Sequence, residues 1–300
     1  MFHIRHQPFY RASVPQFREP WIITSADTVN GWTLLQVQQI NSAANLLASA
    51  LEHEHELVLL LRNGLPILPG TPPTEQRRTG ITPAWYHDGK MYVIPEMTPY
   101  LFLLSQVIAH ELLHVKSGHD ISGYPPGLNR LLTRCEWEIS THQGELAICT
   151  AIQQYLKSTP QFDSDHCRIW IDELEWNRQS AECQITFYAM RKVIIDLVQK
   201  LVEVAHHDSS VVDPRQSQVF VFAQQLSNIY VSQQPEPTAV IAALPSIRSK
   251  IDWFGIPSSL PQQPLIASCL EMWKRLCSKL IEQQALIQSA DIYWQHLRFQ

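Results

Sequence analysis

The sequence predicts a mainly α protein of the α+β type, in which a small β element accompanies several long helices. Apolar residues recur at helical spacing through residues 32–61, 99–118, 128–156 and 167–206. Residues 84–94 instead combine two β-prone runs with a tight-turn signal. With 300 residues, 45% of them hydrophobic, the chain is long enough to bury a substantial core.

The first predicted helix covers residues 32–61 and ends at Asn63-Gly64, a typical helix stop. It contains the run Glu52-His53-Glu54-His55-Glu56, which resembles a metal-binding segment. Residues two apart on a helix do not face each other, so we interpret the run as a polar, solvated face. Residues 65–83 contain five prolines and are predicted to form a loop or linker.

A β-hairpin is predicted in residues 84–94, whose sequence is AWYHDGKMYVI. Asp88-Gly89 lies between the two β-prone runs, and this dipeptide favours a two-residue hairpin turn. Residues 1–30 are interrupted by prolines, and a short strand at residues 21–24 is the one element we assign there.

The helix predicted for residues 99–118 contains the most informative segment of the chain. Thr98-Pro99 is a typical start signal and Gly118 a typical stop. An apolar stripe follows the helix, and His110 and His114 lie to one side of it. The residues of the stripe are Leu101, Leu104, Ile108, Leu112 and Val115. One flank of this helix is therefore expected to pack and the other to line a cleft.

His110 and His114 stand four residues apart, so their imidazoles project from the same face of a helix and can share a metal ion. Glu111 lies beside them. A carboxylate at this position can take a proton from a metal-bound water and pass it to a leaving amine. The spacing therefore predicts a metal centre suited to amide hydrolysis.

Residues 91–120, with their A-H-E-L-x-H core, resemble the active-site strand and helix of the zincin metallopeptidases, of gluzincin or minimal-zincin type. The resemblance implies Zn²⁺ bound by His110 and His114, Glu111 as general base, and a third ligand further along the chain. It also implies a strand beside the helix that pairs with an extended substrate, for which Tyr92–Ile94 is the candidate. The Gly-His that follows the motif is similar to minimal-zincin regulators and phage-exclusion peptidases.

We predict Glu138 as the third metal ligand, because one zincin branch takes this ligand from a glutamate on the following helix. When residues 128–156 are placed at 100° intervals, Glu138 falls on the border of the buried side and Glu145 slightly further out. His142 falls near the middle of that side. It could orient Glu138 from one helical turn away, or it could be a core histidine.

Other carboxylates remain open as the third ligand. Glu175 and Glu182 on the 167–206 helix could supply it, as could Glu145 or Glu136. Asp120 lies ten residues after His110, where a second zincin branch has its ligand. That branch needs a glycine at the position of Ser117, and this chain has its glycine one residue later.

Two more helices are predicted at residues 214–232 and 264–297, separated by a proline-rich segment. We divide the chain into an N-terminal helical region (residues 1–83), a zincin-like catalytic core (84–208) and a helical C-terminal region (209–300).

Composition excludes several classes of partner. The net charge of −5 gives no basic surface for nucleic acid. No apolar run has the length of a signal peptide or a membrane span, so we expect a cytoplasmic protein. Six cysteines without a CxxC pair are expected to be buried free thiols in a reducing compartment. They are Cys135, Cys149, Cys167, Cys183, Cys269 and Cys277.

The sequence thus predicts a zinc-dependent metallopeptidase that acts on protein or peptide substrates. The alternative is a non-catalytic regulator, or a toxin or phage-defence component, with a structural or vestigial metal site and a helical region that binds a protein partner.

Overall fold

The computed structural model describes residues 31–52, 55–71, 84–119, 126–159, 164–232 and 236–298. It confirms a mainly α protein with one small sheet and long helices in the C-terminal part. Within these residues, no helix is both long and apolar enough to cross a bilayer. The predicted strand at residues 21–24 lies outside the described residues.

The chain forms two compact units that share helices α5 (Leu128–Ser158) and α6 (Ser164–His206). The first unit takes its described residues from Met1–His119, Thr141–Ala181 and Trp294–Gln300, and the second from Asp120–Ser140 and Glu182–Tyr293. This grouping by contact does not test the predicted division at residues 83 and 208, which stays a prediction.

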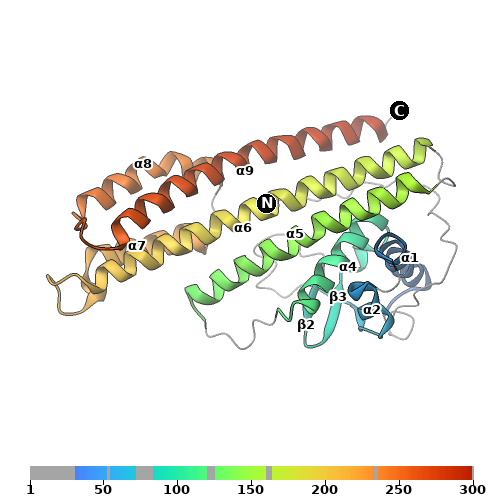
Figure 1. The fold of residues 1–300 in the computed structure, drawn as a ribbon, viewed down its shortest axis with the longest axis horizontal. Coiled ribbons are helices and arrows are strands. Elements are labelled where there is room, and N and C mark those ends of the chain that lie inside the picture. The colour runs from blue at the N-terminus through green and yellow to red at the C-terminus, as the bar shows by residue number, and fades with distance from the viewer. Residues whose placement is uncertain are drawn as a thin grey trace. The chain divides into compact units, whose positions relative to one another are not determined.

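The first unit combines helices with a small three-stranded sheet (Figure 1). Its strands are β1 (Ile67–Pro69), β2 (Ala84–His87) and β3 (Lys90–Val93), in the order β1-β3-β2. β2 and β3 are antiparallel and form the predicted hairpin, in which Asp88 and Gly89 have φ of 49° and 74°. Positive φ at both turn residues is what a type I′ turn requires. β1 pairs in parallel with β3.

Helix α4 (Leu101–Lys116) is the central helix of this unit and contains the His-Glu-x-x-His segment. It packs against α1 (Leu34–Leu51), α2 (Glu56–Arg62) and β2. Leu104, Ile108 and Leu112 of the predicted stripe are fully buried in the core. The same core takes in Ile148 and Ile152 from the second half of α5. The helix with the motif is therefore held on several sides by apolar packing.

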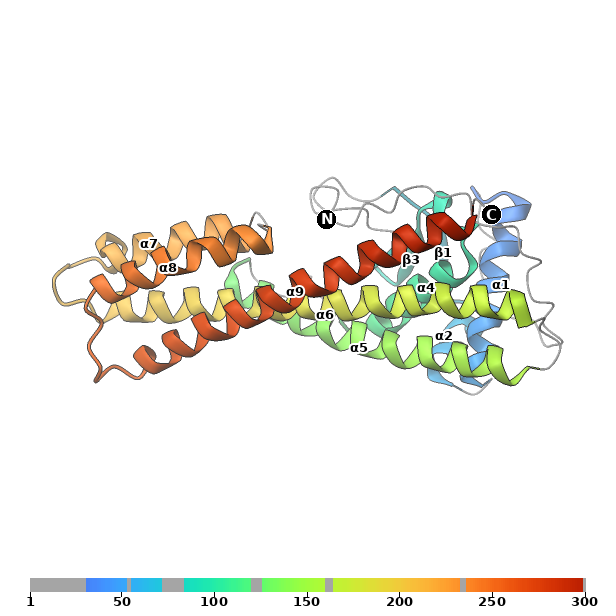
Figure 2. The same ribbon diagram turned by 90° about the horizontal axis from the view of Figure 1, so that it is seen from above.

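The second unit is a helical bundle in the described residues. The second half of α6 and the first half of α9 (Gln262–Arg298) run alongside α7 (Gln218–Leu226) and α8 (Pro237–Trp253) (Figures 1 and 2). Phe222 of α7 contacts Phe254 at the end of α8, and Tyr230 stacks edge-on against Trp273 of α9. Two short turns, η3 (Pro214–Gln216) and the π-helical η4 (Ser227–Val231), flank α7.

The prediction of one helix over residues 32–61 was wrong, because the chain breaks at Glu52, where φ is 68°. His55 then caps α2, its Nδ1 accepting a hydrogen bond from the Leu57 amide. The described residues of the Glu52–Glu56 run therefore lie where α1 ends and α2 begins. The predicted end at Asn63-Gly64 is confirmed.

Two proline-rich segments were wrongly predicted to lack regular structure. Residues 67–69 form β1, whose pairing with β3 is not visible in the local sequence. Pro237 opens α8, and Pro245 lies within it. The helix is held by a buried stripe of Val240, Leu244, Ile247 and Ile251, so tertiary packing offsets the cost of the internal proline.

Candidate metal centre

The observed start of α4 differs from the predicted start, whereas its observed end agrees with the prediction. Thr98 does not cap α4: its hydroxyl donates to the Pro95 carbonyl, and the helix begins at Leu101. At the other end, Gly118 has φ of 63°, and the amides of Gly118 and His119 bond back to the carbonyls of Val115 and His114. This pair of bonds is the Schellman motif.

The Schellman motif brings His119 back over His114. The Nδ1 atoms of the two rings lie 2.9 Å apart, and the ring centroids 5.2 Å apart. The Thr141 hydroxyl also lies 3.4 Å from His114 Nδ1. The Nδ1 side of His114 is therefore occupied by neighbours, and its Nε2 is turned toward His110.

The Nε2 atoms of His110 and His114 lie 3.1 Å apart. Zinc–nitrogen bonds of about 2.0–2.1 Å in tetrahedral geometry place two donor nitrogens about 3.3 Å from each other. Two lone pairs that face each other at such a distance repel, so either one Nε2 carries a hydrogen that it donates to the other, or a metal ion lies between them. The predicted convergence of these imidazoles is present, and the pair fits a proton or a metal ion.

Glu145 of α5 bridges two histidines. Its Oε1 lies 3.2 Å from His110 Nδ1, and its Oε2 is hydrogen-bonded to His142 Nδ1. A carboxylate only accepts hydrogen bonds, so both Nδ1 atoms carry the donated proton. The Nε2 atoms of His110 and His142 are thereby left as the nitrogens available to a metal.

The charge of Glu145 is set by these neighbours. Only 4% of the side chain is exposed, and burial by itself raises a carboxyl pKa. The attraction and hydrogen bonds of His142 and His110 outweigh burial and lower the pKa of Glu145 to about 2. Glu145 is therefore an ionised carboxylate that accepts hydrogen bonds from the Nδ1 atoms of His110 and His142.

Gly144 explains how α5 comes so close to α4. A Cβ at this position would lie 2.7 Å from Leu113 Cδ1. Because glycine has no side chain, Leu113 occupies that space, and the turn at Thr141–Glu145 lies against the histidine face of α4. This contact places Glu145 on the most buried side of α5, which corrects the prediction that it lies further out than Glu138.

Glu138, the predicted third ligand, lies one turn before His142. One donor atom each from His110, Glu138 and His142 can be chosen so that all lie within 4.8 Å of one another. Glu138 also faces Arg134, with 3.6 Å between Oε1 and the guanidinium Nε. The helical wheel correctly placed it at the border of the buried side, since 13% of its side chain is exposed.

The other predicted carboxylates have different neighbours. Glu175 accepts from Arg178 at 2.6 and 2.9 Å, and Glu136 pairs with Lys192 at 2.8 Å. Glu182 lies on α6 and belongs to no group of three potential metal ligands among the described residues. Asp120 lies outside the described residues. Glu111, the predicted general base, is on α4 with 7% of its surface exposed.

The predicted substrate strand is contradicted by the sheet. β3 is the central strand, paired with β1 on one side and β2 on the other, so Tyr92 and Val93 have no free edge. Within the described residues, the edges of the sheet belong to β1 and β2. β2 is the strand that packs on α4.

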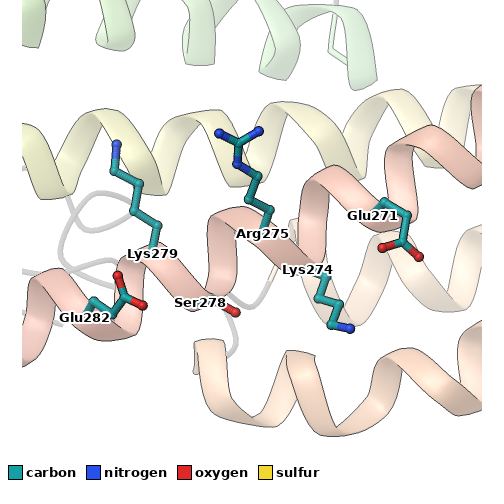
Figure 3. A pocket seen from close by; sticks show the side chains of 6 residues that line it. All are labelled: Glu271, Lys274, Arg275, Ser278, Lys279 and Glu282. Carbon is teal, nitrogen blue, oxygen red and sulfur yellow. The ribbon is translucent and has the colours of Figure 1, made fainter.

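A hollow on α9 offers no comparable chemistry (Figure 3). Its lining mixes basic and acidic side chains with one hydroxyl: Glu271, Lys274, Arg275, Ser278, Lys279 and Glu282. Glu271 is also paired with Arg248 of α8 at 3.0 Å. The lining contains no imidazole or thiol, and we do not assign a metal to it.

Comparisons of the chain with protein-family models, curated proteins and solved structures found no match.

Proposed function

We propose that this protein is a zinc-dependent metallopeptidase whose metal is bound by His110 and His114. The observation that carries the proposal is the 3.1 Å separation of the two Nε2 atoms, on imidazoles whose Nδ1 atoms face Glu145 and His119. Neutral imidazoles oriented in this way are common zinc ligands. Glu138, from the adjacent turn of α5, is the proposed carboxylate ligand.

When bound, the zinc ion would supply Lewis acidity, which polarises a substrate carbonyl and makes water a stronger acid. The residues of the chain would supply proton transfer and positioning. Glu111 takes the proton of the attacking water and transfers it to the leaving amine. Glu145 keeps the proton of His110 on Nδ1, and buried packing of α4 fixes the rotation of the helix. Peptide-bond hydrolysis is the reaction that this set of groups serves best.

The direct test compares wild type with Glu111→Gln after both have been loaded with zinc. We expect the variant to retain zinc and to hydrolyse an unfolded, fluorescently labelled casein about 10²- to 10⁴-fold more slowly, the usual contribution of a general base. Glu96→Gln, which changes an exposed glutamate just before α4, is the matched control. Equal turnover by wild type and Glu111→Gln would contradict a catalytic role for Glu111.

A second candidate function is favoured by the number of donors in the cluster. His110, His114, Glu138 and His142 together could close a four-ligand site, which is typical of structural zinc. The protein would then be a non-catalytic regulator. Replacing zinc with Co²⁺ and adding a small hydroxamate separates the two, because the visible spectrum shifts only if the metal has an open position.

A further inference from the structure

His142 is the side chain of the cluster for which the proposed function has no role. It lies on α5, between Glu138 and Glu145, and its ring centroid is 4.8 Å from that of His110. Only 12% of its side chain is exposed. A histidine this buried needs partners for its ring nitrogens, and the structure gives Nδ1 the carboxylate of Glu145.

The same carboxylate serves His110, one oxygen for each ring. A metal-bound histidine usually donates its other N–H to a carboxylate or carbonyl, which fixes the tautomer and raises the basicity of the ligand nitrogen. Glu145 provides this contact to His142 as well as to His110. The two rings are thus prepared in the same way, although only His110 belongs to the sequence motif.

We propose that His142 binds the same metal ion through Nε2, as a third imidazole beside His110 and His114, and that Glu145 is the positioning residue for both His110 and His142. The proposal rests on the metal centre of the proposed function. All four residues belong to the first compact unit. In this ligand set His142 takes the place of Glu138 as the third protein ligand, so three imidazoles leave one position of a tetrahedral zinc ion open, as hydrolysis requires.

The distances support a shared ion. His110 already lies 3.1 Å from His114 between Nε2 atoms, and His142 offers a donor atom within 4.8 Å of a donor of His110. The ring centroids support the same arrangement, since that of His110 lies 4.7 Å from that of His114 and 4.8 Å from that of His142.

The test measures zinc affinity by competition with a chromophoric chelator, independently of any activity. We expect His142→Ala to weaken binding by more than about 100-fold, beyond the range usual for outer groups. Glu145→Gln should weaken it about 10- to 100-fold, since an amide cannot accept from both rings. His207→Ala and Glu175→Gln, both outside the cluster, should bind zinc as wild type does.

Thermal unfolding of each metal-free variant shows whether it folds, and X-ray absorption of the zinc-loaded wild type needs no variant. Three imidazoles per zinc are expected in that spectrum. Two imidazoles, or wild-type zinc affinity in folded His142→Ala, would overturn the role of His142 and leave the proposed function intact. Wild-type protein that binds no zinc would overturn the proposed function itself.

Discussion

The two compact units differ most in what they bury. In the described part of the first unit, the buried polar residues include two acids, Glu111 and Glu145, together with Thr141 and Asn177. In the described part of the second unit, the polar residues in the buried class are Thr186 and Ser217. The other residues of its buried class are aliphatic, aromatic or sulfur-containing. Buried charge is costly unless it is paired, and the two buried acids of the first unit lie on α4 and α5, the helices of the proposed metal centre.

The thiols illustrate the contrast. All six cysteines are free, as predicted, and Cys135, Cys183 and Cys277 are buried in the second unit. Burial raises the pKa of Cys183 and of Cys277 to about 12. A buried thiol with so high a pKa carries almost no thiolate at neutral pH and is not activated as a nucleophile. These cysteine side chains therefore contribute packing, whereas the buried Glu145 of the first unit contacts two imidazoles.

The largest effect expected from this contrast is on stability. Trp273, which is 1% exposed and stacks edge-on against Tyr230, is a central side chain of the second unit. We expect Trp273→Ala to lower the free energy of unfolding by about 3–5 kcal/mol, the usual cost of removing a buried aromatic ring. Urea unfolding followed by circular dichroism measures this cost.

Zinc affinity of the folded Trp273→Ala protein should be unchanged, since Trp273 lies in the second unit and the imidazoles of the proposed metal centre lie in the first. Trp273→Phe is the matched control: it keeps an aromatic ring and removes a buried indole N–H that has no hydrogen-bond partner. A loss of zinc binding in folded Trp273→Ala would break the contrast between the two units.

A smaller effect is expected at Gly118, where φ of 63° favours glycine. Gly118→Ala should cost about 1 kcal/mol of stability, because the Schellman motif is strained by a Cβ. It should also weaken zinc binding several-fold, since His119 is held on His114 by that motif. Gly255→Ala, at the end of α8 with φ of 60°, is the control. It should cost similar stability and leave zinc affinity as in wild type.

Local patterns predicted much of the fold. Some elements depend only on residues near each other in sequence. They are the Asp88-Gly89 turn, the helix end at Gly118, and helices α5 and α6 with their extended apolar periodicity. The break at Glu52 and the pairing of β1 with β3 depend on distant partners, which local periodicity does not report. Helix α8 was missed because its prolines concealed a regular apolar stripe.

The candidate site divides in the same way. His110 and His114 are close because they share a helix, and the motif alone predicts that. The burial of Glu145 was not predicted, because the face of α5 that meets α4 is set by Gly144 and Leu113, a contact between residues on different helices. His119 was not singled out as a partner of His114. The signal that could have identified it is the Gly118-His119 pair, since a Schellman motif turns the next residue back over the helix.

Metal content tests the central claim most directly. Wild type and the His110→Ala/His114→Ala double variant are dialysed against equal zinc, freed of unbound ion, and measured by atomic absorption. We predict about one zinc per wild-type chain and almost none in the double variant, with far-UV circular dichroism showing that both are folded. Equal zinc in the two folded proteins, or none in wild type, would contradict a metal centre at these two imidazoles.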